Sequence, residues 1–127
     1  MRDIILINLP TNAWYKKEIA RGNAMPPLGL MYIATVLQQN EYAVELIDLS
    51  VEGMTEEDFV CHITKEKPKI IGISTYNEAW LALKVISACI KKVLPECIIV
   101  AGGAFATFVY KDVLGESAVD MISTKIR

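Results

Sequence analysis

The sequence predicts one domain of the α/β class, in which a mostly parallel β-sheet carries helices on both of its faces. Three observations lead to this prediction. Short apolar runs recur along the chain, as in parallel strands that are covered on both sides. Segments with the period of amphipathic helices separate these runs. The chain has 127 residues, 53% of them hydrophobic, which is enough for one core and too few for two domains of ordinary size.

The expected strands are five apolar runs rich in β-branched residues. In chain order they are Ile4–Leu9, Val44–Leu49, Ile70–Ser74, Ile98–Gly102 and a shorter run, Val119–Ser123. Helices are expected between them. One helical face is formed by Leu30, Ile33, Ala34 and Leu37, and another by Ile86, Ile90, Val93 and Leu94. Tyr32 and Trp80, at helical spacing, are interpreted as packing residues.

Capping and breaking residues support these boundaries. Thr55 followed by Asp58 resembles a capping box. Helices are expected to stop at Asn40, Pro68, Pro95 and Gly115. The predicted order is therefore βαβαβαβαβ, and the handedness of crossover connections leaves few topologies for it. A flavodoxin-like (Rossmann-like) sheet of five parallel strands is the natural candidate.

In such sheets ligands bind beyond the carboxyl ends of the strands. The first strand is followed by an unusually long connection, Pro10 to Pro27, which carries Trp14, Lys16 and Arg21 to this edge. Residues 74–77, at the end of the third strand, all have hydrogen-bonding side chains. Residues 102–107, at the end of the fourth strand, begin with two glycines. We expect these three segments to converge on one crevice. Each also has a simpler reading, as a solvated loop, a helix cap or the end of a strand.

Several ligand classes lack their motif in this chain. Neither GxGxxG after the first strand nor GxxxxGK[ST] is present, which argues against a dinucleotide or a P-loop site. The acidic residues of a phospho-receiver domain are missing too, since Asp48 ends the second strand and the third ends at Ser74. Cys61, Cys89 and Cys97 lack the spacing of a zinc or iron–sulfur site, so we expect free thiols and no metal ligands within this segment.

Charge and hydropathy exclude further partners. The formal charge of −2 leaves no basic stripe for nucleic acid. No apolar run is long enough to span a membrane, and the N-terminus is unlike a signal peptide, so a cytoplasmic location is expected.

The motifs together resemble a known family. The stretch Pro26-Pro27-Leu28-Gly29-Leu30 opens the first helix, the second and third strands read VELID and IGIS, and VAGG runs into Ala106-Thr107-Phe108. This series resembles the N-terminal cobalamin-binding domain of B12-dependent radical SAM enzymes, and the resemblance covers nearly the whole chain. Two departures stand out: the family often has Gly-Gly-Pro-His where this chain has Gly102-Gly103-Ala104-Phe105, and the usual Gly-Glu-Gly-Glu stretch is replaced by residues 123–127.

The resemblance implies that cobalamin lies at the carboxyl edge, with its dimethylbenzimidazole tail beside Ser74 and Gly102-Gly103. The implied cofactor-binding residues are Pro10, Pro27, Leu28, Gly29, Ser74, Thr75, Tyr76, Asn77, Gly102, Gly103, Phe105 and Thr107, and no catalytic residue is implied. The chain lacks the DxHxxG motif whose histidine ligates cobalt in methionine synthase and the mutases. His62, the only histidine, is interpreted as a surface helix residue remote from the edge, so base-off binding without a protein ligand is expected.

By the same resemblance, the chemistry takes place on a neighbouring radical SAM domain with a 4Fe-4S cluster and S-adenosylmethionine, in methyl transfer or cyclisation. The CxxxCxxC motif of that domain is absent here, so residues 1–127 are expected to be one domain, an N-terminal fragment of a larger protein. The alternative is a cofactor-free flavodoxin-like regulatory or interaction domain. In either case the two prolines, 26 and 27, restrict the backbone where the long connection turns into the first helix.

Overall fold

The computed structural model describes residues 2–9, 28–49, 54–74, 80–103 and 110–123. Five parallel strands form one sheet in the order β2-β1-β3-β4-β5. Their bounds are β1 Ile4–Asn8, β2 Val44–Asp48, β3 Ile70–Ser74, β4 Ile98–Gly102 and β5 Met121–Ser123. The predicted flavodoxin-like sheet is confirmed.

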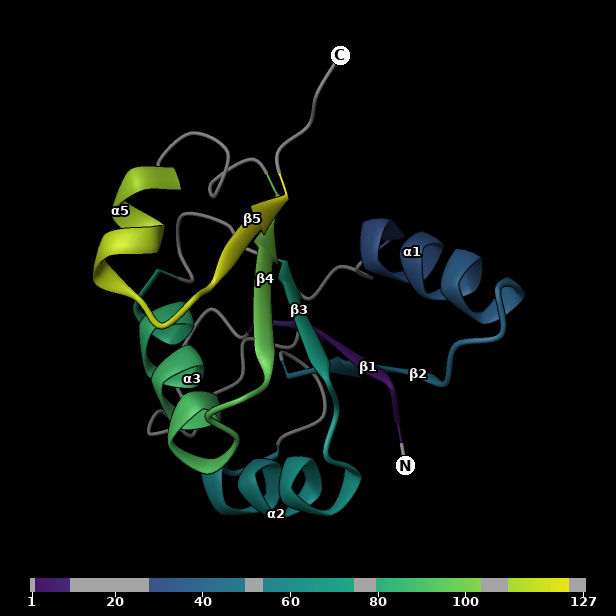
Figure 1. Ribbon diagram of the computed structural model, residues 1–127, viewed down its shortest axis with the longest axis horizontal. Helices are drawn as coiled ribbons and strands as arrows, with labels where there is room; N and C mark the ends of the chain where they lie inside the picture. The colour runs from purple at the N-terminus through teal and green to yellow at the C-terminus, as the bar shows by residue number, and fades with distance from the viewer. Residues whose placement is uncertain (1, 10–27, 50–53, 75–79, 104–109, 124–127) are drawn as a thin grey trace, which may run out of the picture.

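The helices of the described residues lie on both faces of this sheet (Figure 1). They are α1 Leu28–Gln39, α2 Glu56–Glu66, α3 Trp80–Val93 and α5 Tyr110–Glu116. Helices α2, α3 and α5 pack on one face, whereas α1 packs on the other. Since every helix connects two parallel strands of the sheet, each must start at the carboxyl edge of the sheet and run back toward its amino edge.

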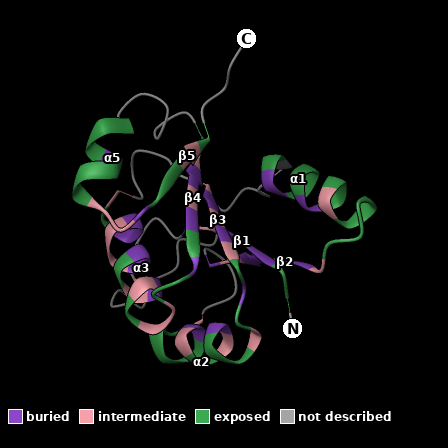
Figure 2. Cartoon of the chain, in the orientation of Figure 1, coloured by how far each residue is buried: buried purple, intermediate pink, exposed green. Residues whose placement is uncertain are grey.

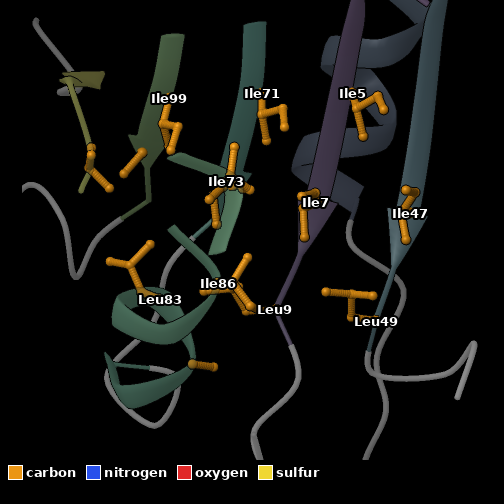
Figure 3. Packing of buried hydrophobic residues seen from close by; sticks show 14 of the residues in the cluster. Ile5, Ile7, Leu9, Ile47, Leu49, Ile71, Ile73, Leu83, Ile86 and Ile99 are labelled. Carbon is orange, nitrogen blue, oxygen red and sulfur yellow. The ribbon is translucent and has the colours of Figure 1, made fainter. Parts of the chain in front are cut away.

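The larger core lies between the sheet and helices α2, α3 and α5. Alternate strand residues point to this side because side chains along a strand alternate between the two faces of a sheet. Ile5, Ile7, Ile71, Ile73 and Ile99 supply its sheet wall, and all are at most 2% exposed (Figure 3). Ile86 and Leu83 of α3 pack against them, and Phe59 and Ile63 of α2 are fully buried in the same cluster.

The smaller core lies under α1. Leu30 and Ala34 of α1 pack on Ile4 and Leu6 of β1 and on Val44 of β2, with Leu37 partly buried beside them. Helix α1 therefore covers mainly β1 and β2. The expected helical face of α1 is confirmed except at Ile33, whose side chain is 46% exposed.

The predicted helix ends are largely confirmed. Thr55 Oγ1 accepts a hydrogen bond from Asp58 N while Asp58 Oδ2 accepts one from Thr55 N, which completes the capping box of α2. Helices α1, α2 and α3 end one or two residues before Asn40, Pro68 and Pro95. Gly115 lies inside the last turn of α5 rather than after it. Boundaries of this kind commonly differ by a residue or two.

The two aromatic predictions on helices have different outcomes. Trp80 packs against the larger core, and Lys84 Nζ lies 4.7 Å from the centroid of its ring. Tyr32 is 73% exposed, so its interpretation as a packing residue is wrong. It lies on the side of α1 opposite Leu30, Ala34 and Leu37, which Figure 2 shows as exposed.

Candidate functional site

The last residues of the five strands form one row across the carboxyl edge. The register pairs Asp48 with Asn8, Asn8 with Ser74, Ser74 with Gly102, and Gly102 with Ser123. Side chains at these paired positions share the α1 face, because the positions two residues earlier belong to the core under α1 or stand in register with it. All five residues are therefore small or polar at the place where the fold binds ligands.

One end of this row is tied by a hydrogen bond. Asn8 Nδ2 donates to Asp48 Oδ1 at 2.9 Å, and both side chains are half-buried. This charge-assisted hydrogen bond restrains both side chains and helps to shape the wall beneath α1. The row thus begins with a rigid polar pair and continues into smaller residues over β3, β4 and β5.

The glycines at the end of β4 have different reasons to be glycine. Gly103 has a φ of 104°, a conformation that L side chains rarely adopt. A Cβ added at Gly102 would meet only Ser123, at 3.8 Å, which is ordinary van der Waals contact. Packing within the chain therefore does not require glycine at position 102, and the space above it is available to another group.

Gly29 lies in the first turn of α1, at the same edge of the sheet. A Cβ built on it would meet no atom within 4 Å. The space beside Gly29 is therefore open and leaves room for a ligand. Glycine costs helix stability relative to alanine, and packing among the described residues does not require glycine at position 29.

Some of the predicted cofactor-binding residues can be placed. Leu28 and Gly29 begin α1, Ser74 ends β3, and Gly102 and Gly103 end β4. The structure brings Ser74 and Gly102 side by side in register. Pro10, Pro27, Thr75, Tyr76, Asn77, Phe105 and Thr107 lie outside the described residues, as does the connection with Trp14, Lys16 and Arg21.

His62 lies on helix α2, as predicted, and its side chain is partly exposed. Its Nε2 atom lies 2.6 Å from Glu45 Oε1, and 27% of the side chain is exposed. Glu45 is near the amino end of β2, on the face opposite the row of strand ends. The expectation that His62 is remote from the carboxyl edge is confirmed.

The sequence analysis missed three residues of this edge, Asn8, Asp48 and Ser123, and one residue in the middle of β3, Gly72. The first three follow from the register, which a sequence alone does not give. Gly72 lies on the α1 face, where a Cβ would come within 2.8 Å of Leu6 Cδ2. Leu6 thus extends over β3 from β1, and the available signal was a lone glycine inside an otherwise β-branched strand.

Two groups with shifted pKa values, Cys97 and Asp120, lie away from this edge. Burial raises the pKa of the Cys97 thiol, which is buried at the amino end of β4. Partial burial would raise the pKa of Asp120, but hydrogen bonds from Lys91 Nζ and Ile99 N outweigh it and lower that pKa. These groups hold α3, β4 and β5 together at the amino edge. In the part of the chain that the structure describes, no group of three metal-ligating side chains could hold an ion.

Comparison with protein families matches residues 19–124 to the B12 binding domain. The chain belongs to this family. The match covers most of the chain and includes β2, β3, β4 and β5, whereas β1 precedes it. The resemblance noted from the sequence is confirmed, and so is the expectation of cobalamin as the cofactor of the domain.

The B12-binding domain is similar in sequence to parts of several longer proteins. It is 31% identical over 105 residues to an uncharacterized methyltransferase of Pyrococcus horikoshii, and 31% identical over 116 residues to hopanoid C-3 methylase of Methylococcus capsulatus. It is 31% identical over 101 residues to an anaerobic magnesium-protoporphyrin IX monomethyl ester cyclase of Synechocystis. These matches cover 83%, 89% and 77% of this chain but only 22%, 22% and 20% of the relatives.

Solved structures share the fold. The cobalamin-dependent S-adenosylmethionine radical enzyme OxsB, solved with aqua-cobalamin bound, matches 91% of this chain and 16% of its own with a TM-score of 0.67 and 23% identity. A cobalamin-binding protein from Desulfitobacterium hafniense matches 96% of this chain with a TM-score of 0.56 and 16% identity. Within the described residues, no helix is both long and apolar enough to cross a membrane.

Proposed function

We propose that this domain holds cobalamin base-off at the carboxyl edge, without a protein histidine on cobalt, for a radical SAM domain in the same longer polypeptide. The observation that carries the proposal is the row of small and polar residues over β3, β4 and β5. Ser74, Gly102 and Ser123 stand in register there, on the face that α1 leaves uncovered. A flat nucleotide base can approach a sheet closely only where the side chains are this small.

The residues present fit the cofactor in size and polarity. The hydroxyl groups of Ser74 and Ser123 can donate to or accept from the amide and phosphate groups of a cobalamin tail. Gly29 leaves open space at the start of α1, on the same side of the sheet. Pro10, Pro27, Leu28, Thr75, Tyr76, Asn77, Gly103, Phe105 and Thr107 complete the proposed set.

The position of His62 supports the absence of a protein ligand to cobalt. The histidine is paired with Glu45 on the opposite face of the sheet, and Glu45 is three residues before the end of β2. To reach the edge, this side chain would have to break its pair and cross the strand. When bound, the cofactor would supply the chemistry of a carbon–cobalt bond.

The relatives support a catalytic domain in the same polypeptide. The chain spans about a fifth of their length, and they include a methylase, a methyltransferase and a cyclase. We infer that residues 1–127 form an N-terminal domain, and that a 4Fe-4S cluster and S-adenosylmethionine bind downstream. The cytoplasmic location stays a prediction.

Retention of hydroxocobalamin by the purified protein tests this function. The full-length gene product and residues 1–127 are each incubated with the cofactor, desalted and examined by visible spectroscopy. We expect near-stoichiometric corrin absorbance with the spectrum of a base-off form in the full-length protein. The alternative, a cofactor-free regulatory domain, predicts a full-length protein without corrin absorbance, and that result would reject cobalamin binding.

The form of the cofactor is a separate outcome of the same experiment. The variant His62→Ala should retain the cofactor with an unchanged spectrum, because the imidazole lies on the other face of the sheet. A spectral change on this substitution would show that a protein histidine reaches cobalt and would contradict the proposed mode of binding.

A further inference from the structure

The polar pair at the start of the row has one hydrogen-bonding atom to spare. Asn8 Nδ2 donates to Asp48 Oδ1, and the backbone carbonyl of Asn8 accepts from Leu49 N at 3.0 Å. Both bonds tie Asn8 to the end of β2. Among the described residues, no group bonds to the side-chain oxygen of Asn8, and this side chain is half-buried. The oxygen is therefore an acceptor that a ligand can use.

Asp48 decides which end of the Asn8 amide faces β2. A carboxylate accepts hydrogen bonds and has none to donate, so it takes the NH₂ end of the amide. The amide oxygen then points away from Asp48. Strand β1 lies between β2 and β3, and Asn8 stands in register with Asp48 on one side and with Ser74 on the other. The oxygen is thus turned toward the part of the edge where cobalamin is proposed to lie.

Cobalamin carries donors that suit this acceptor. Primary amides surround the rim of its corrin ring, and each of them has N–H groups to donate. The ends of β1 and β3 are about 4.8 Å apart, so a cofactor whose tail lies over Ser74 can bring a rim amide within reach of Asn8. A carboxylate at the same place on the rim would have no hydrogen to donate and would face the oxygen of Asn8, close to the charge of Asp48.

We propose that the side-chain oxygen of Asn8 accepts a hydrogen bond from a primary amide of the corrin rim, and that Asp48 is the positioning residue that turns this oxygen toward the cofactor. The inference rests on the proposed function, because it requires cobalamin at the carboxyl edge. It adds a specificity to that function. The site prefers the fully amidated corrin to an analogue in which the contacted amide is hydrolysed to a carboxylate.

A purely structural role for the pair would be to tie β1 to β2. The backbone already holds these strands together, since they pair from Ile4 and Val44 to Asn8 and Asp48, and Leu49 N adds a bond to Asn8 O. A tie requires only that the two side chains bond to each other. Recognition also requires an acceptor on the side of the cofactor, so the two roles differ in how binding depends on the ligand.

Spectroscopic titration of the full-length protein with hydroxocobalamin and with its separated monocarboxylic acids tests the proposal. In Asp48→Asn, the new amide can donate to the oxygen of Asn8 and so withdraw this acceptor from the cofactor. We expect hydroxocobalamin to bind about tenfold more weakly, and its advantage over the most strongly rejected monocarboxylic acid to shrink by a similar factor. Asp120→Asn makes the same substitution at the amino edge and should change neither value.

The exchanged pair, Asn8→Asp combined with Asp48→Asn, supplies the rescue. The amide at position 48 can donate to the carboxylate at position 8, whose second oxygen then faces the cofactor. Affinity for hydroxocobalamin should return close to that of the natural protein, and the monocarboxylic acid should be rejected more strongly than before. The ratio of the two affinities is measured within each variant, so a change in the stability of the fold does not alter it.

The other outcomes overturn the inference. Unchanged affinities in Asp48→Asn would show that the pair does not reach the cofactor, and an equal loss for every ligand would show that it only supports the fold. An effect that is absent with diaquacobinamide, which keeps the rim amides but lacks the nucleotide, would place the contact on the tail. A natural protein that binds hydroxocobalamin but rejects none of the monocarboxylic acids contradicts this inference alone, whereas one that binds no corrin rejects the proposed function and the inference with it.

Discussion

Gly72 shows how one residue shapes the sheet face that carries the site. Leu6 Cδ2 would lie 2.8 Å from a Cβ at this position, so a larger residue here would require the side chain of Leu6 to shift. Leu6 is 5% exposed and belongs to the core under α1. A larger residue at position 72 would therefore require the small core to adjust, although the sequence marks this glycine only as a break in an isoleucine run.

Gly29 tests whether the open space at the start of α1 belongs to a ligand. Gly29→Ala is expected to stabilise the cofactor-free protein by up to about 1 kcal/mol, because alanine favours a helix and meets no atom within 4 Å. Hydroxocobalamin should bind the variant about tenfold more weakly, the cost of crowding a filled site by one methyl group. Denaturant unfolding and a spectroscopic titration measure the two effects.

Gly115 supplies the matched control, because a Cβ there also meets no atom within 4 Å, and it lies in the last turn of α5 at the opposite edge of the sheet. Gly115→Ala should leave cobalamin affinity unchanged. If both variants bind the cofactor like the natural protein, Gly29 does not line the site.

Asp120 gives the fold a pH-dependent contact. Its Oδ2 atom accepts from Lys91 Nζ at 2.6 Å and from Ile99 N at 2.9 Å, and these hydrogen bonds outweigh partial burial and lower its pKa. A carboxyl group whose pKa is lower in the folded state stabilises the fold above its unfolded pKa, and this contribution is lost as the pH falls through the folded value.

Asp120→Asn should therefore lower the free energy of unfolding by about 1 kcal/mol at neutral pH, with a difference that shrinks below about pH 4. Urea unfolding of both proteins from pH 7 to pH 3 measures it. Glu96→Gln, at an exposed carboxyl group just before β4, should change the free energy of unfolding little at any of these pH values. A difference that is constant with pH would show that the ionised carboxylate is not the cause.

At the scale of elements, local signals predicted α2 more fully than α1. The capping box of α2 is present in both directions, and Lys67 ends the helix in the left-handed conformation with its N–H on Ile63 O. For α1 the apolar period correctly gave the buried residues Leu30 and Ala34 but also included Ile33, which is exposed. Periodicity identifies an apolar face, whereas the partner that covers it depends on tertiary structure.

Thr55→Ala tests the cap of α2. The substitution removes the acceptor of the Asp58 N–H, so we expect a loss of about 1 kcal/mol in the free energy of unfolding. Thr64→Ala is the control within the same helix, because Thr64 is exposed and its hydroxyl donates only to Val60 O one turn earlier. Equal effects of the two substitutions in urea unfolding would mean that the cap contributes no more than an ordinary exposed position.

At the scale of the whole molecule, the sequence predicted the architecture because strand and helix periods alternate without interruption. The order β2-β1-β3-β4-β5 then follows from few allowed crossovers. The register of the strands could not be predicted from the sequence. The row that brings Asn8, Ser74 and Gly102 together depends on this register and could not be predicted either. The pair of His62 with Glu45 was also unpredictable, since its residues are 17 positions apart and on separate elements.

The central claim is that cobalamin lies against the ends of β3, β4 and β5, and Gly102→Leu tests it most directly. A Cβ at Gly102 meets only Ser123 at 3.8 Å, so we expect the variant to fold with a near-natural melting temperature. Its side chain would fill the space above the row. In the full-length protein, the Kd for hydroxocobalamin should rise by about a hundredfold, since an overpacked site loses up to about 3 kcal/mol. A folded variant that binds the cofactor as tightly as the natural protein would contradict this account.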